Sequence, residues 1–157
     1  MLALVFAAAF ATSPLPPTDL TRSVLTDVCL PYVTGAAIDP AAMALLGFVP
    51  ATSPDADTRT FQTEDAAWLL RLTTNGSEDD GNLNRVCVIQ ARRGGLDGAR
   101  GAVQPVLREQ GFSPEAGQPA DRPIWTRAGV TVSVRQNEGR AAVIRVTYSS
   151  LDAEGQD

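Results

Sequence analysis

The sequence predicts an α+β fold in which an antiparallel sheet of about four to five strands carries three helices on one face. Two observations favour this class: three segments have apolar residues at helical spacing, and two pairs of β-rich segments are each joined by a turn. A chain of 157 residues is the size of one domain and can bury a core of its own. We therefore expect a single domain over residues 18–150, followed by a disordered tail over residues 151–157.

The first eleven residues are expected to be a signal peptide. Residues 2–11 read LALVFAAAFA, an apolar run of the length of a signal-peptide core that is too short to cross a bilayer. Ala9 and Ala11 give the small-x-small pattern that a signal peptidase accepts, so cleavage is expected near Ala11. Residues 12–17 then form an extended linker. The predicted location is the periplasm or the extracellular medium, and a buried N-terminal strand or helix is the alternative.

Two helical segments open the domain. Asp19 offers an N-cap side chain, and the apolar spacing that follows predicts a helix ending near Pro31. Asp39 then precedes a proline, and Ala41–Leu46 favours a second helix that Gly47 ends.

The only cysteines, Cys29 and Cys87, are expected to form a disulfide, because two cysteines in an exported chain are usually paired. This bond places the end of the first helix against a strand, with the two Cα atoms within about 7 Å. It also predicts that Cys87 and Ile89 point toward the helices while Val86 and Val88 point away. Two buried free thiols are the alternative.

One loop and one hairpin follow the second helix. Residues Thr52–Thr63 lack periodicity and predict a loop, with a short strand at its end as an option. Trp68–Leu72 and Val86–Ile89 are apolar and rich in strand-forming residues, and the polar segment Asn75–Asn82 between them predicts a turn.

The second half of the domain predicts one helix and one hairpin. Apolar residues at helical spacing run over Leu96–Leu107, and Gly111 ends the helix. Val130–Arg135 and Ala142–Tyr148 alternate between apolar and polar residues, and a turn around Gly139 joins them.

A weak internal repeat relates the two halves. The sequence Gly-Phe-x-Pro ends a helix at residues 47–50 and again at residues 111–114, and each copy precedes a tryptophan and a hairpin. The sequence therefore also admits a tandem helix-hairpin repeat, although a common helix-ending motif explains the same pattern. This layout is similar to that of β-lactamase inhibitory proteins and of small outer-membrane assembly lipoproteins, without a motif that matches residue by residue.

The composition excludes most common enzyme chemistries. The chain has no His and no Lys, so it has no Ser-His-Asp or Cys-His catalytic unit, no histidine-ligated metal and no P-loop lysine. We expect a protein that is not an enzyme and binds neither cofactor nor metal. The acidic balance, with a net charge of −5, gives no support for nucleic-acid binding.

Two groups of residues are candidate sites. Arg92, Arg93 and Arg100 lie in a glycine-rich tract where a strand leads into a helix, an arrangement that suits an anion, although a solvated connection is the simpler interpretation. Trp68 and Trp125 belong either to the core or to an exposed protein contact.

These observations favour an exported, non-enzymatic protein that binds another envelope or secreted protein, as an inhibitor or an accessory subunit. Contact is expected through the sheet face or through the loops Thr52–Thr63 and Asn75–Asn82, without a membrane partner after signal cleavage. A small-anion or small-ligand module that uses the arginine tract is the alternative. A carboxylate hydrolase is third, because Asp55–Asp57 and Glu64–Asp65 are paired carboxylates.

Overall fold

The computed structural model describes residues 17–77, 79–136 and 139–154. The predicted signal peptide, residues 1–11, and all but the last residue of the predicted linker lie outside these ranges.

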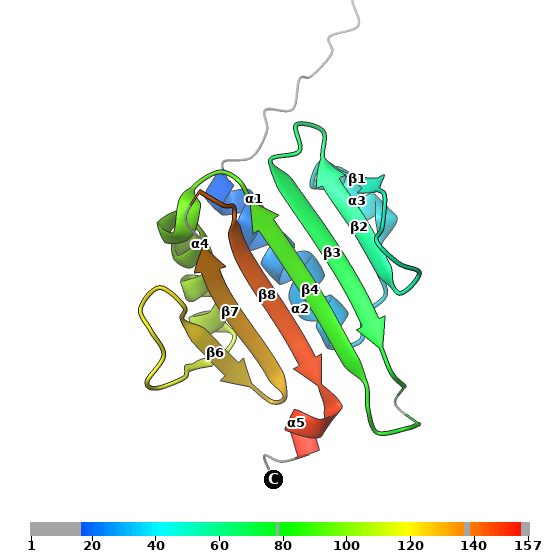
Figure 1. The fold of residues 1–157 in the computed structure, drawn as a ribbon, viewed down its shortest axis with the longest axis vertical. Helices are drawn as coiled ribbons and strands as arrows, with labels where there is room; N and C mark the ends of the chain where they lie inside the picture. Colours follow the sequence, from blue (N-terminus) through cyan, green and yellow to red (C-terminus); the bar gives the residue numbers. More distant parts are fainter. Residues whose placement is uncertain (1–16, 78, 137–138, 155–157) are drawn as a thin grey trace, which may run out of the picture.

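One antiparallel sheet of eight strands forms the centre of the molecule, with the order β1-β2-β3-β4-β8-β7-β6-β5 (Figure 1). The strands are β1 (Phe48–Ala51), β2 (Thr58–Thr63), β3 (Trp68–Asn75), β4 (Asn84–Ala91), β5 (Ser113–Pro114), β6 (Ile124–Arg127), β7 (Val130–Gln136) and β8 (Ala142–Ser149). Each half of the chain contributes a meander of four consecutive strands, and the two meanders join where β4 pairs with β8.

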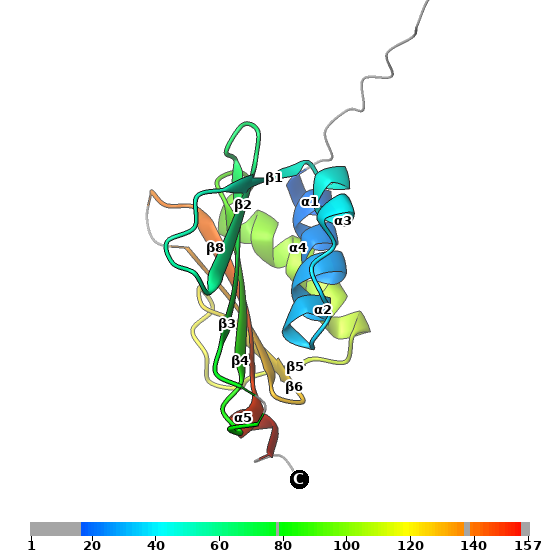
Figure 2. The same cartoon turned by 90° about the vertical axis from the view of Figure 1, so that its right-hand side faces the viewer.

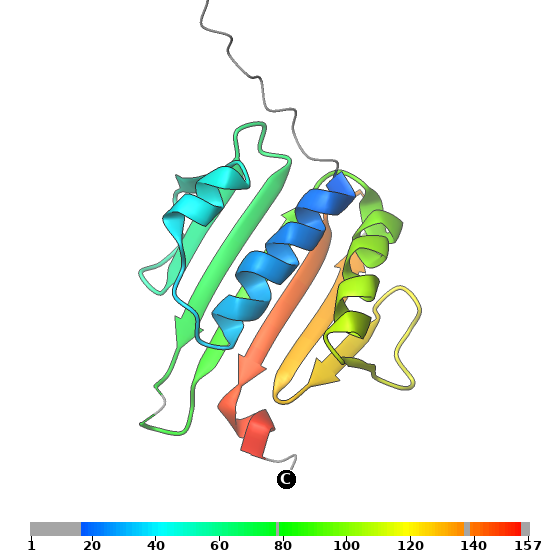
Figure 3. The same cartoon turned by 180° about the vertical axis from the view of Figure 1, so that it is seen from behind.

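The main helices cover one face of this sheet and leave the other without a helix (Figures 2 and 3). A continuous helical segment comprises α1 (Pro17–Ser23), the π-helical η1 (Val24–Cys29) and α2 (Leu30–Val33), and α3 (Pro40–Leu45), α4 (Gly95–Glu109) and the C-terminal α5 (Ser150–Glu154) complete the set. The helix α3 begins as the sequence predicts, because the Asp39 side chain accepts a hydrogen bond of 2.8 Å from the backbone N–H of Ala41.

The core lies between the helices and the sheet. Every second residue of the long strands is buried against the helices, as Leu70, Ile89 and Ile144 are, while Leu25 and Val103 fill the same layer from α1–η1–α2 and α4. This alternation is the one that a sheet covered on one side requires.

The predicted disulfide is confirmed. Cys29 at the end of η1 is bonded to Cys87 in β4, with a Cα–Cα distance of 5.4 Å. Cys87 and Ile89 are fully buried under the helices, whereas Val86 and Val88 are only half-buried on the other face. The predicted orientation of β4 is therefore correct as well.

The predicted fold class is wrong in the number of strands and helices. The sheet has eight strands, not four to five, and α5 adds a helix to the three that the sequence indicates. The helix-hairpin repeat unit is also wrong, because each half has four strands. The missed strands β1, β5 and β6, and β2, which the sequence analysis gives only as an option at the end of Thr52–Thr63, are short or polar. Pairing with a neighbour in the sheet forms them where apolar periodicity gives no signal.

The two Gly-Phe-x-Pro segments occupy similar places, since each glycine has a positive φ at a helix end and each phenylalanine, Phe48 or Phe112, is buried. The two tryptophans, in contrast, do not correspond, because Trp68 begins the third strand of its meander and Trp125 lies in the second strand of the other. At the C-terminus, residues 150–154 form α5 where the sequence predicts a disordered tail from residue 151.

Candidate functional site

The face of the sheet that carries no helix is the candidate site. Residues directly opposite each other in an antiparallel pair share a face, so the strand register identifies its members. We call this surface the open face, and its strand residues are Val49, Ala51, Thr58, Thr60, Gln62, Leu69, Arg71, Thr73, Asn75, Asn84, Val86, Val88, Gln90, Val143, Arg145, Thr147, Ser149, Thr131, Ser133, Arg135, Ile124, Thr126 and Ser113.

The strand residues of the open face include cationic side chains and no acidic ones. Of the 13 arginines in the chain, six lie in strands, whereas none of the acidic residues that the structure describes does. Arg71, Arg135 and Arg145 belong to the open face, and its other polar residues are threonines, serines, glutamines and asparagines. Within residues 17–77, 79–136 and 139–154, the acidic residues are thus confined to helices and connections, and the strands of an acidic protein present basic side chains on their open face.

Two of these arginines flank one valine near the middle of the face. Arg71 in β3 and Arg145 in β8 are both direct cross-strand partners of Val88 in β4. Arg145 donates a hydrogen bond of 3.3 Å from Nε to Thr147 Oγ1. Within the described ranges, neither arginine forms an ion pair, so both charges are available to a partner.

Proline occurs in both edge strands. Pro50 lies in β1 and Pro114 in β5, and both strands are short. Proline lacks the N–H that an added strand needs, and short edge strands with proline are a common protection against edge-to-edge pairing. A partner is therefore expected on the face of the sheet and not at its edges.

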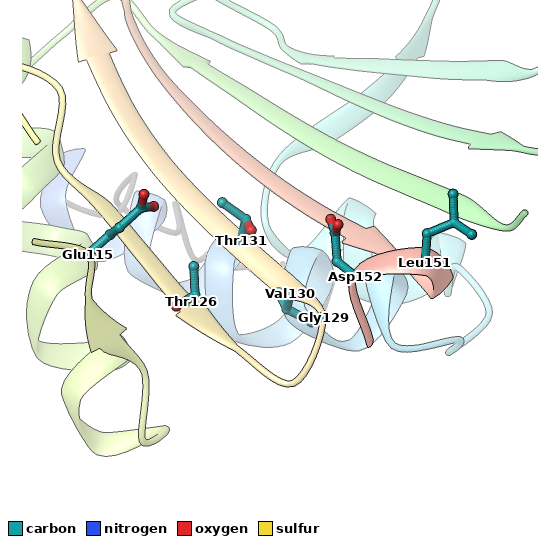
Figure 4. Close-up of a pocket in the computed structure, with 7 residues that line it drawn as sticks. All are labelled: Glu115, Thr126, Gly129, Val130, Thr131, Leu151 and Asp152. Atoms are coloured by element: carbon teal, nitrogen blue, oxygen red, sulfur yellow. The ribbon is translucent and has the colours of Figure 1, made fainter. Parts of the chain in front are cut away.

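Two open hollows lie at opposite ends of this face. One, of about 720 Å³, is lined by Thr60, Gln62 and Arg71 together with Thr52 and its neighbours at the end of β1. The other, of about 470 Å³, lies beside α5, and Figure 4 shows Thr126 and Thr131 between the carboxylates of Glu115 and Asp152. The residues that line the first hollow include an arginine and no acidic residue, and those that line the second include two acidic residues and no basic one.

Some polar groups of the glycine-rich tract that contains Arg92, Arg93 and Arg100 already bind other residues of the protein. Arg93 forms an ion pair of 3.0 Å with Asp65. At the start of α4, the backbone N–H of Leu96 donates a hydrogen bond of 2.8 Å to Gln136 Oε1. Backbone N–H groups at a helix N-terminus can bind an anion, but this one already has an acceptor within the protein. Arg92 is exposed and Arg100 is half-buried.

The tryptophans lie in the core. Trp68 and Trp125 are 4% and 8% exposed, and both pack on the helix side of the sheet. The indole N–H of Trp68 donates to Thr21 Oγ1 at 3.3 Å. Both tryptophans therefore belong to the core, and neither forms the exposed protein contact that the sequence analysis gives as the other possibility.

The predicted contact loops lie at the border of the sheet. Half of Thr52–Thr63 is strand β2, and the rest connects β1 to β2 on the side of the sheet away from the helices (Figure 2). The segment Asn75–Asn82 connects β3 to β4 at one end of the sheet (Figure 1).

Asp65 has a structural role in the turn between β2 and β3. Its Oδ1 accepts hydrogen bonds from Thr63 Oγ1 at 2.7 Å and from the Ala67 N–H at 3.0 Å. These hydrogen bonds, first that of Thr63 and then that of Ala67, together with the charge of Arg93 hold the pKa of Asp65 below its usual 3.8. The carboxylate is already used by this turn, which gives no support for a hydrolytic role.

Asp65→Asn is expected to destabilise the protein at about pH 7 and to have little effect at about pH 3. A lowered pKa in the folded state means that the carboxylate stabilises the fold above its unfolded pKa, and that this contribution is lost as the pH falls through the folded value. Urea unfolding at both pH values measures the difference. Asp27→Asn, the same charge change at an exposed helical position, is the control. A destabilisation that is the same at both pH values would contradict this role.

The described residues include no group of three His, Cys, Asp or Glu side chains that could hold a metal ion. No helix in the same part of the chain is both long and apolar enough to cross a membrane. In comparisons with known proteins, no protein family, no curated protein and no solved structure matches this chain. A function for this chain therefore rests on its own geometry.

Proposed function

We propose that this protein is an exported, non-enzymatic binding protein whose open face docks a partner protein with an acidic surface. The observation that carries the proposal is the separation of charge: in a chain with a net charge of −5, the strand residues of the open face include three arginines and no carboxylate, and the carboxylates of Glu115 and Asp152 border the face only at its β6–β7 end. Complementary charge steers association and selects among partners, so a basic face favours an acidic one.

The size of the open face supports a protein partner. Strands of eight residues are about 26 Å long, and six neighbouring strands span about 24 Å, at roughly 3.3 Å per residue and 4.8 Å between strands. The resulting area of about 600 Å² is similar to the roughly 800 Å² that each partner contributes to a standard interface. Small molecules, in contrast, usually bind in enclosed pockets.

The disulfide supports the export part of the proposal, since such bonds persist in oxidising compartments. Mass spectrometry of the mature protein from its native host is expected to find an N-terminus close to Thr12. An intact residue 1 on a protein that stays in the cytoplasm would contradict export.

Replacing Arg71, Arg135 and Arg145 by Gln is expected to abolish capture of the partner from envelope extract by the purified protein. Each arginine at a binding centre contributes on the order of a tenfold change in affinity, so losing all three is expected to make the complex too weak to capture. Capture by the wild type is also expected to weaken as salt rises, because charges separated by about 10 Å are screened at 0.1 M salt.

The matched control replaces Arg22, Arg92 and Arg108, which are exposed and lie outside the open face, by Gln. It changes the net charge equally and is expected to leave capture intact. Equal loss in both triple variants would show that net charge, and not the open face, causes binding. Equal retention in both would contradict the proposal.

A further inference from the structure

Two residues that line the hollow at the β1–β2–β3 end of the open face each have one buried polar atom that the fold leaves without a partner. The buried side-chain nitrogen and oxygen atoms that lack a hydrogen bond in residues 17–77, 79–136 and 139–154 are Thr60 Oγ1, Arg71 Nε and Asn84 Oδ1. Two of the three residues, Thr60 and Arg71, line the same hollow of about 720 Å³. Thr60 is only 5% exposed.

These two atoms are neighbours by register. Thr60 in β2 and Arg71 in β3 are direct cross-strand partners, so their Cβ atoms lie about 5 Å apart. A buried donor without an acceptor is costly, and more so on a charged group. Buried polar groups form hydrogen bonds in the great majority of cases. Two neighbouring groups without a hydrogen bond, both on residues that line a hollow, therefore indicate that an acceptor is missing.

The missing acceptor must be an anion or a group with strong acceptor oxygens. Arginine can only donate, and the threonine hydroxyl can rotate to donate as well. The strands supply no carboxylate, because none of the acidic residues in the described part of the chain lies in a strand. Gln62 adds a further amide donor to the lining.

We infer that this hollow binds a carboxylate group, with Arg71 holding it through its Nε–Nη edge and Thr60 donating from its hydroxyl. The planar guanidinium matches a carboxylate in a bidentate fork, and a rotation of the half-buried side chain brings Nε into the hollow. This inference rests on the proposed function, in which the carboxylate belongs to an Asp or Glu side chain of the partner and anchors it at one end of the open face.

A titration followed by ¹H–¹⁵N NMR tests the site without the partner. The probe is N-acetylglutamate N-methylamide, which carries one acidic side chain, and N-acetylglutamine N-methylamide is its neutral equivalent. The glutamate probe is expected to shift the Nε–Hε signal of Arg71 and the amide signal of Thr60, and the glutamine probe is expected to shift neither. Equal shifts with both probes, or no shift with either, would overturn the inference.

Three variants separate a specific fork from general charge. Arg71→Lys keeps the charge and lacks the fork, so binding of the glutamate probe is expected to weaken about tenfold. Thr60→Val keeps the shape and removes the hydroxyl, and it is expected to weaken binding by a smaller factor. Arg145→Lys makes the same change elsewhere on the open face and is expected to leave the probe's affinity unchanged. Equal weakening by Arg71→Lys and Arg145→Lys would contradict the site, and unchanged amide spectra elsewhere verify that each variant is folded.

The same variants distinguish this site from the proposed function. If the glutamate probe binds and no partner is captured, the carboxylate site is correct and protein docking is not. If Arg71→Lys captures the partner as well as the wild type does, docking is correct and the anchor is not. A free dicarboxylate such as glutarate that binds far more tightly than the glutamate probe would identify a small acid, and not a side chain, as the ligand, which would also overturn the anchor.

Discussion

Loss of the Cys29–Cys87 disulfide is expected to lower the free energy of unfolding by about 4 kcal/mol, since the bond closes a loop of 58 residues in the unfolded chain. Most domains are stable by only about 5–15 kcal/mol, so the change removes a large share of the total. Both cysteines are fully buried, and Cys29→Ala with Cys87→Ala therefore tests the bond more cleanly than a reductant does. Urea unfolding measures the difference.

Without the disulfide, stability is expected to fall more in some parts of the fold than in others. The bond joins the end of η1 to a central strand, whereas β7 and β8 lie outside the closed loop. Hydrogen exchange is expected to rise first in α1–η1–α2 and later in β7 and β8, because local stability follows local constraint. An alkylation assay that finds two thiols in the unfolded, unreduced protein, or a double variant as stable as the wild type, would contradict this account.

Gly76→Ala is expected to destabilise the protein by about 3 kcal/mol or more. Gly76 has a φ of +76°, and an added Cβ would lie 1.8 Å from the backbone oxygen of Asn82, so the β3–β4 connection must rearrange. The left-handed conformation costs only about 1–2 kcal/mol by itself, and the backbone collision accounts for the remainder.

Gly81→Ala is the matched control for that collision. Gly81 lies in the same connection with a φ of +63°, but an added Cβ meets no atom within 4 Å. Its cost is therefore expected to be the conformational part alone, about 1–2 kcal/mol. Equal losses of stability in the two variants would show that the connection does not have the backbone approach described here.

The sequence predicts the parts of the fold that local patterns encode. The Asp39–Pro40 start of α3, the alternation in β7 and β8 and the pairing of Cys29 with Cys87 all appear where they are expected. In contrast, β2 reads as Thr-Arg-Thr-Phe-Gln-Thr and has no clear apolar face, because it lies near the edge of the sheet. Such strands depend on a partner that one sequence does not show.

The candidate site depends on register even more than the strands do. Arg71 and Arg145 each lie between two apolar residues, in Leu-Arg-Leu and Ile-Arg-Val. Because side chains alternate between the two faces of a strand, this pattern places each arginine on the face opposite to the apolar one. That the two faces are the same, with both side chains beside Val88, follows only from the pairing of β3, β4 and β8. The sequence instead draws attention to Arg92, Arg93 and Arg100, which are close along the chain and of which Arg93 is paired with Asp65.

Site-specific photo-crosslinking tests most directly whether the open face is the binding surface. A photoreactive residue is introduced at Ser133 or Thr147 on the open face, and at Ala41 or Gln104 on the helices, and each variant is irradiated in the native host. We expect Ser133 and Thr147 to crosslink to one acidic protein that mass spectrometry identifies, and Ala41 and Gln104 to give no product with it. Crosslinks from the helical positions alone, or the absence of any product from the open face, would contradict the proposal that the partner docks on the sheet.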